Sequence, residues 1–280
     1  MPGYLEKNSY GKHAVNLSKI IRHADHHEFR QISVDTQLQG DFEHVYLKGD
    51  NTPVLATDTQ KNSIYALAKD YFTASVEAFA LHLANYFLNH EAPITQATVA
   101  ITEHLWSRMR LGDSMHQHAY ISQGGEQHTT RAICNAGGAR IWSGINHLLI
   151  LKTTDSAFTG FLRDRYTTLK ESSDRILATE CMVEWLWNST REDFSAYDSI
   201  RDTLLETFAH HKSLSVQQTL YAMGEAVLEK YPAVAEIELV MPNKHHIPFN
   251  LEQFGMENNN EIFVATDEPY GYITGTVKRT

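Results

Sequence analysis

The stretch NSIYALAKDYFTASVEAFALHLANYFLN, residues 62–89, decides the fold. Its apolar residues recur at spacings of three and four, as on one face of an amphipathic helix: Ile64, Leu67, Tyr71, Phe72, Val76, Phe79, Leu83 and Phe87. Asn62 or Ser63 can cap the start of this helix, and Pro93 follows soon after its end. The pattern therefore predicts one long helix, which we expect to lie across a sheet.

Segments with a period of two, typical of strands, flank this helix. In the first half of the chain they are residues 15–20, 32–38, 42–47, 97–106 and 127–134. Gly40 and Asp41 favour a hairpin turn between two of them, and SQGGEQ at 122–127 is predicted to form another turn. The first half is therefore expected to contain strands, a long helix, and strands again.

The second half repeats this order. Strands are predicted at residues 139–154, 175–188, 234–241 and 260–279, the last of them ending in a hairpin around EPYG. Helices are predicted at residues 156–169, where Ser156 is the expected cap, and at 194–211 and 215–231. Pro232 follows the last helix and precedes a strand, as Pro93 does in the first half.

This parallel predicts two tandem domains, residues 1–136 and 137–280, joined near NAGGAR at 135–140, where two glycines supply a flexible joint. Strands grouped around helices without regular βαβ alternation indicate an α+β fold, with antiparallel sheets and helices on one face. The free edges of such sheets need covering, and joining subunits edge to edge is one way to cover them.

The composition excludes several classes of protein. The chain has 24 basic and 34 acidic residues and a formal charge of −10, which argues against a nucleic-acid-binding surface. It has no run of 18 apolar residues and no signal-peptide pattern at its start. Cys134 and Cys181 form no disulfide or metal pattern, so a reduced, cytoplasmic protein is expected. Among the 16 histidines, HADHH (23–27) and HQH (116–118) fit no zinc spacing and are interpreted as solvated.

No nucleotide-binding glycine motif, nucleophile elbow or HExxH motif is present, so chemistry is expected to come from side chains alone or from an unmarked metal. Polar residues at the ends of predicted elements are the candidates: Lys12, Thr57, Asp58, Arg175, Gln217, Asn243 and His245. Each also has a plain structural explanation. Thr57 and Asp58 are good helix caps, and Arg175 beside Asp174 fits a surface ion pair. MPNKHHIPFN, 241–250, could hold metal ligands, a phosphate clamp, a proton-transfer site or only a solvated turn.

Taken together, several ordered motifs resemble the urate oxidase (uricase) family. They are SYGK, VLATDTQKN, LLILKTTDSAFTGFLRDRYTTL, DRILAT, SVQQTLY, PNKHHIPFN and NEIFVATDEPYG, and they span residues 8 to 272. The resemblance implies the tunnelling fold (T-fold): two tandem domains per subunit, with four subunits stacked into a barrel around a tunnel. It also implies oxidation of urate by molecular oxygen to 5-hydroxyisourate and hydrogen peroxide, without a metal or organic cofactor.

The resemblance also assigns roles to residues. Lys12 and Thr57 match the catalytic pair of the family, with Thr57 reaching the site from a neighbouring subunit, and His245 completes a proton relay through water. Phe158 matches the ring that stacks on the purine, and Arg175 and Gln217 match a pincer that holds its polar edges. Asn243 matches the residue that holds oxygen or water above the ring. Backbone contacts to urate are implied for three residues: Thr57, Asp58 and Val216.

Two further hypotheses remain open at this stage: a zinc-dependent pterin or purine-ring enzyme of the tunnelling fold, and a purine-binding protein without activity. The first requires a Cys/His ligand set, which the isolated cysteines do not supply. Members of the family in eukaryotes end on a peroxisomal Ser-Lys-Leu type signal, whereas this chain ends TVKRT. A cytoplasmic enzyme is therefore expected.

Overall fold

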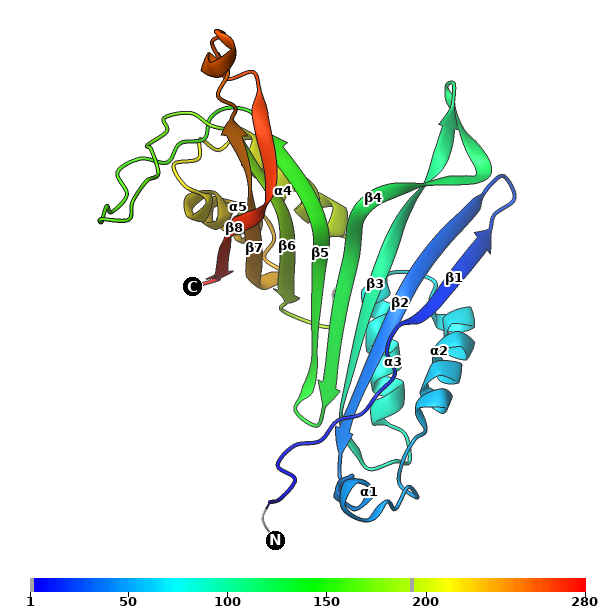
Figure 1. The fold of residues 1–280 in the computed structure, drawn as a ribbon. Coiled ribbons are helices and arrows are strands. Elements are labelled where there is room, and N and C mark those ends of the chain that lie inside the picture. The colour runs from blue at the N-terminus through cyan, green and yellow to red at the C-terminus, as the bar shows by residue number, and fades with distance from the viewer. Residues whose placement is uncertain (1–2, 192–193) are drawn as a thin grey trace. The chain divides into compact units, whose positions relative to one another are not determined.

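The computed structural model describes residues 3–191 and 194–280, so residues 1–2 of the first predicted domain lie outside the described part (Figure 1). The chain forms two compact units. Unit 1 contains Met1–Gly144 and Leu186–Ser195, and unit 2 contains Ile145–Trp185 and Ala196–Thr280. The predicted domain boundary after residue 136 stays a prediction. No helix among the described residues is long and apolar enough to cross a membrane.

The sheet of unit 1 is antiparallel and follows chain order through four strands: β1 (Val15–Arg22), β2 (His27–Gly40), β3 (Ile94–Leu111) and β4 (Ser114–Asn135). The predicted alternation is confirmed on β2, whose inward side chains are fully buried: Ile32, Val34, Thr36 and Leu38. Helices α2 (Thr57–Tyr71) and α3 (Val76–Leu88) pack against this sheet (Figure 1). The core of unit 1 lies between these two layers.

The single helix predicted over 62–89 is wrong in one respect: it is broken into α2 and α3. Ser75 accepts a hydrogen bond from the backbone N–H of Ala78 at 3.1 Å and so caps a new helix. Phe72 and Phe79 stack across the break with their ring centroids 5.2 Å apart. The apolar stripe therefore continues through the break, and periodicity alone could not reveal it.

Three further local predictions are also wrong. Residues 42–47 do not form a strand, because Glu43–Lys48 is a short helix, α1, of which no residue is buried. SQGGEQ is not a hairpin turn: the pairing of β4 with β3 shifts between His104 and Trp106, so these residues bulge within one strand. EPYG likewise lies within β8 (Phe263–Lys278), where the pairing shifts between Asn243 and His245 of the neighbouring strand.

In unit 2 the strands again follow chain order: β5 (Gly138–Lys152, which begins in unit 1), β6 (Leu177–Trp187, which ends in unit 1), β7 (Val234–Pro248) and β8. Helices α4 (Tyr197–His210) and α5 (Val216–Lys230) contact each other, and α5 packs on β7 and β8. A single 3-10 turn, η1 (Glu252–Phe254), lies between β7 and β8. The two helices predicted at 194–211 and 215–231 are thus confirmed.

The first turn of α3 carries a fully buried carboxylate, Glu77. It accepts hydrogen bonds from Nε2 of His128 at 2.7 Å and from Oγ of Ser143 at 2.5 Å. Nδ1 of His128 lies 3.9 Å from Oε2 of Glu103, which is paired with Arg30 at 2.7 Å. Burial opposes the charge of Glu77, but the hydrogen bonds and charge of His128, with the Ser143 hydroxyl, lower its pKa below the ordinary 4.5.

We expect Glu77→Gln to lower the free energy of unfolding by about 3 to 5 kcal/mol, because it removes one partner of a buried charge network. A lowered pKa means that the stability from Glu77 is fully present above the unfolded value of about 4.5 and is lost as pH falls through the folded value. Urea unfolding across this range should show an acid-dependent loss in the wild type that the variant lacks. Exposed Glu91→Gln is the control, and equal stability of both variants would contradict the expectation.

Candidate active site

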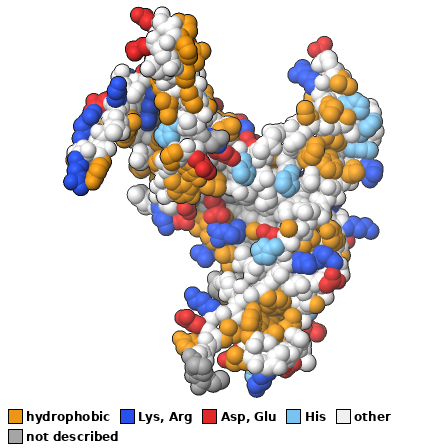
Figure 2. Space-filling model, in the orientation of Figure 1, with side chains coloured by type: hydrophobic (Ala, Val, Ile, Leu, Met, Phe, Trp, Pro, Cys, Tyr) orange, Lys and Arg blue, Asp and Glu red, His pale blue; other side chains and the backbone are white. Residues whose placement is uncertain are grey.

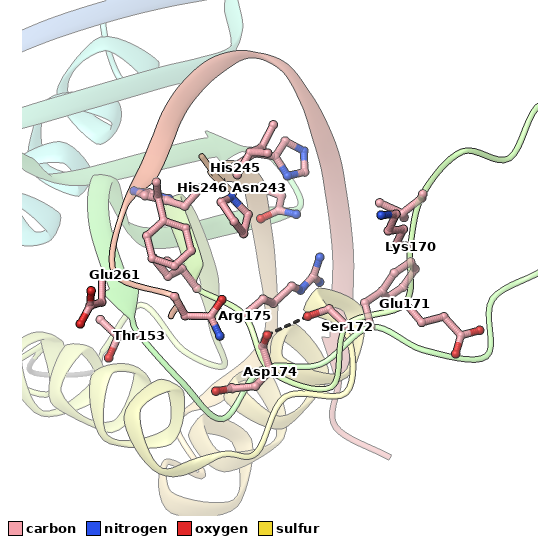
Figure 3. Close-up of a pocket in the computed structure, with 17 residues that line it drawn as sticks. Thr153, Lys170, Glu171, Ser172, Asp174, Arg175, Asn243, His245, His246 and Glu261 are labelled. Atoms are coloured by element: carbon pink, nitrogen blue, oxygen red, sulfur yellow. Dashed lines mark hydrogen bonds between the residues drawn. The ribbon is translucent and has the colours of Figure 1, made fainter. Parts of the chain in front are cut away.

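A cavity of about 660 Å³ lies within unit 2. Its walls come from the loop between β5 and β6, from the end of β7, and from the start of β8 with the residues before it. Four of the residues predicted from sequence line it together: Phe158, Arg175, Asn243 and His245, of which the last three are labelled in Figure 3. The tertiary structure thus brings together side chains that are up to 87 positions apart in the chain.

The loop that carries Phe158 and Arg175 is not the helix predicted over 156–169. Its backbone groups are used elsewhere: Phe158 exchanges two hydrogen bonds with Ser172, at 2.8 and 3.1 Å, and the N–H of Arg175 donates to Ser156 O at 2.8 Å. Gly160 has a φ of +69°, which a helix does not tolerate. The loop is therefore fixed by long-range backbone bonds, and Ser156 is not a helix cap.

Phe158 belongs to a stack that the sequence reasoning missed. The rings of Phe158 and Phe161 are nearly parallel, at 11°, with centroids 5.0 Å apart. The guanidinium carbon of Arg175 lies 5.2 Å from the Phe158 centroid, and that of Arg163 lies 5.1 Å from the Phe161 centroid. Phe161 therefore holds the ring plane of Phe158. The two phenylalanines in AFTGF, residues 157–161, are the sequence feature from which this stack could have been predicted.

The polar groups of the cavity are suited to a flat ligand with acceptor groups. Nε of Arg175 is buried and has no hydrogen-bond partner among the described residues. Burial lowers the pKa of Arg175, yet a guanidinium stays charged at neutral pH. Burial, and then the charge of Arg175, lower the pKa of His245 below its ordinary 6.5. His245 is therefore neutral near pH 7 and can accept a proton.

The nitrogen-bearing side chains at the end of β7 line two different cavities. Asn243 and His245 line the main cavity, while Nζ of Lys244 pairs with Oε2 of Glu180 at 3.0 Å and lines a separate small cavity. Lys244 therefore points away from Asn243 and His245. His246 also lines the main cavity.

The first turn of α5 carries Val216 and Gln217, which do not line the cavity. Val216 is buried and Gln217 is exposed. The chain just before them is tied to the Phe158 loop, because the N–H of Ala157 donates to Ser213 O at 2.7 Å. The structure thus places this helix start beside the loop of the site without bringing the two side chains into the cavity.

Lys12, Thr57 and Asp58 lie in unit 1, on the segment before β1 and at the start of α2. Neither Thr57 nor Asp58 caps the helix: the N-cap is Ala56, without a side-chain hydrogen bond. The hydrogen bond and charge of Lys61 lower the pKa of Asp58, and the charge of Lys12 adds a smaller lowering. Lys12 and Asp58 are therefore close enough to interact within one chain.

A metal could be held at one place in the described part of the chain, the turn between β1 and β2. Donor atoms of His23, His26 and Glu28 all lie within 4.8 Å of one another there, and His23 is hydrogen-bonded to Glu28 at 2.8 Å. Figure 2 shows histidine side chains gathered on the surface in this region. Cys134 and Cys181 are both buried, and burial raises the pKa of Cys181 to about 12. Neither cysteine belongs to the three-residue group.

Comparison with known proteins gives one consistent result. The sequence model of the uricase family matches residues 8–133 and 141–274. The uricase of Arthrobacter globiformis is 43% identical over 276 residues, covering 98% of this chain and 90% of the relative. The uricase of Danio rerio is 36% identical over 286 residues, covering 98% of this chain and 94% of the relative.

Solved structures agree. The crystal structure of uricase from Arthrobacter globiformis superposes with a TM-score of 0.95 at 42% identity, covering 100% of this chain and 96% of that one. A uricase from Bacillus fastidious shares the fold, with a TM-score of 0.85 at 20% identity, covering 97% of this chain and 93% of that one. The resemblance seen in the motifs is thereby confirmed, and the chain belongs to the uricase family.

Proposed function

We propose that this chain is an oxidoreductase that converts urate, O2 and water to 5-hydroxyisourate and hydrogen peroxide. Urate gives up two electrons to O2, and water supplies the new hydroxyl group. Besides membership of the uricase family, one observation carries the proposal: an aromatic ring and a buried guanidinium with an unused N–H line one cavity in unit 2. A flat, anionic purine matches both groups.

In the proposed complex, urate stacks on Phe158, and Arg175 donates paired hydrogen bonds to one polar edge. Gln217 holds the other edge from the first turn of α5. Asn243 holds oxygen or water above the ring. Contacts from the backbone come from three further residues: Thr57, Asp58 and Val216.

The proposed proton transfers use Lys12, Thr57 and His245. The Lys12 amine lowers the proton affinity of the Thr57 hydroxyl, and His245 exchanges protons with it through water. The lowered pKa of His245 supports this role, since a neutral imidazole at neutral pH can take up a proton. No cofactor is required in this scheme, because urate itself supplies the electrons.

We further propose that the two halves, residues 1–136 and 137–280, are tandem T-fold domains and that four subunits form a barrel with a central tunnel. The candidate residues divide between the units: Lys12, Thr57 and Asp58 lie in unit 1, and the remaining ones lie in unit 2. This division supports sites at subunit interfaces that combine unit 1 of one subunit with unit 2 of another. The two buried free cysteines support a reducing, cytoplasmic setting.

The test is to incubate the purified protein with urate in air, with and without a metal chelator, and to follow urate and peroxide. We expect urate to disappear with one peroxide formed per urate, equally in both samples. Consumption that requires added zinc would instead favour a zinc-dependent ring enzyme. Urate binding in equilibrium dialysis without any consumption would favour a purine-binding protein, and either outcome would overturn the proposal.

A further inference from the structure

The backbone of Lys12 is bound directly to Thr36 on β2. The N–H of Thr36 donates to the carbonyl of Lys12 at 2.8 Å, and the N–H of Lys12 donates to the Thr36 hydroxyl at 3.0 Å. Gly11 makes this approach possible, since a Cβ on residue 11 would lie only 1.7 Å from the Thr36 carbonyl oxygen. The position of Lys12 is therefore set by contact with β2.

A buried glutamine continues this chain of hydrogen bonds into α2. The Thr36 hydroxyl donates to Oε1 of Gln60 at 2.7 Å, and Nε2 of Gln60 donates to the carbonyl of Leu55 at 3.2 Å. Thr36 and Gln60 are both fully buried. The Thr36 hydroxyl accepts from Lys12 and donates its one hydrogen to Gln60. The Gln60 amide accepts with its oxygen and donates with its nitrogen, so each of the two groups acts both as an acceptor and as a donor.

Leu55 is held at both of its backbone groups, two residues before Thr57. Its carbonyl accepts from Gln60, and its N–H donates to the Tyr10 hydroxyl at 3.1 Å. Tyr10 in turn exchanges backbone hydrogen bonds with Leu38 on β2, at 3.0 and 2.7 Å. The segment before β1 and the start of α2 are thus joined at two points, through Tyr10 and through Gln60.

We propose that Thr36 and Gln60 are positioning residues for the reaction. They hold the backbone of Lys12 and the backbone at the start of α2 in a fixed position relative to each other. This inference rests on the proposed function, in which the Lys12 amine acts on the Thr57 hydroxyl. Neither Thr36 nor Gln60 touches urate in this scheme. Their effect is on geometry, and a displacement of about 1 Å can cost about 10²-fold in rate.

Apolar side chains at positions 36 and 60 would not hold the same backbone groups. A leucine at position 60 would fill space but leave the Leu55 carbonyl and the Thr36 hydroxyl without these partners. A valine at position 36 has nearly the shape of threonine and leaves the N–H of Lys12 unpaired. The backbone bond from Thr36 N–H to Lys12 survives this change. Thr36→Val therefore removes the side-chain link alone.

The experiment compares Thr36→Val, Thr36→Ser and Gln60→Leu with the wild-type enzyme. The kcat for urate is measured in air, and the Kd for urate is measured without oxygen by equilibrium dialysis. We expect kcat to fall at least about tenfold in Thr36→Val and Gln60→Leu with Kd changed less than about threefold, since other residues bind the ring. Thr36→Ser keeps the hydroxyl and should retain more than about half of the wild-type kcat.

The matched control is Thr130→Val, which removes another buried hydroxyl in unit 1, one that donates to Trp142 O at 2.7 Å. It should lower stability to urea without changing kcat. Should Thr36→Val match Thr130→Val in both stability and kcat, Thr36 is merely structural and the inference is overturned. A wild-type protein that fails to consume urate would instead overturn the proposed function, so the two failures are distinct.

Discussion

Lys12→Met is expected to lower kcat for urate oxidation by about 10²- to 10⁴-fold, the range that positioned acid–base groups contribute. Methionine keeps the length of the side chain and removes the amine that is proposed to act on the Thr57 hydroxyl. Urate affinity should change little, because Phe158 and Arg175, which are proposed to hold the ring, lie in the other unit. Turnover in air and anaerobic urate dialysis measure the two quantities separately.

Lys7→Met is the matched control for this variant. Lys7 is exposed and lies on the same segment before β1, so its replacement should leave both kcat and affinity unchanged. Thr57→Ala should behave like Lys12→Met if the pair acts together. Equal losses of kcat and urate affinity in either variant would show that these residues bind urate and do not catalyse its oxidation.

Hybrid oligomers of Lys12→Met and Arg175→Gln subunits are expected to regain activity that neither variant has alone. If each site takes unit 1 from one subunit and unit 2 from another, random mixing leaves about one site in four with both halves intact. Co-expression of the two variants with different tags, followed by purification through both tags, isolates the hybrids. Their urate turnover should approach about a quarter of the wild-type value.

The control for this experiment is the hybrid of Lys12→Met with Thr57→Ala. The resemblance brings Thr57 alone from a neighbouring subunit, but the segment of Lys12 and the start of α2 are joined within unit 1 of one chain through Thr36 and Gln60. Lys12 and Thr57 are therefore proposed to enter a site from the same subunit, so both defects fall on the same half of it. No recovery is expected from this pair. Recovery here, or none in the Lys12→Met and Arg175→Gln hybrid, would contradict sites shared between subunits in this manner.

Much of the fold was predictable because the strands and most helices obey local rules. Period-two alternation placed β1, β2, β7 and the second half of β4, and the three-and-four spacing placed α4 and α5. Two of the failures, at SQGGEQ and at EPYG, share one cause. Bulges within β4 and β8 and true hairpin turns contain the same polar and glycine-rich residues, and only the pairing register tells them apart.

The candidate site was predictable in part. Its residue types came from motifs, and Phe158, Arg175, Asn243 and His245 do line one cavity. The side chain of Phe161 was missed, because a stack depends on a loop shape that backbone bonds to distant residues impose. From the sequence, Thr36 is only one inward residue of a strand, and Gln60 is only one residue of a family motif.

The sequence by itself determined the family, the residues available for chemistry and the alternation that buries one face of each sheet, since these depend on residue identity and short-range spacing. Only the tertiary structure decided how these residues are held. Lys12 and Thr36, and Thr36 and Gln60, are each separated by 24 positions in the chain. The first pair forms only when the segment before β1 lies along β2, and the second only when Gln60 of α2 reaches β2. Hydrogen bonds between buried groups depend on where folding brings the chain, and no local pattern encodes that distance.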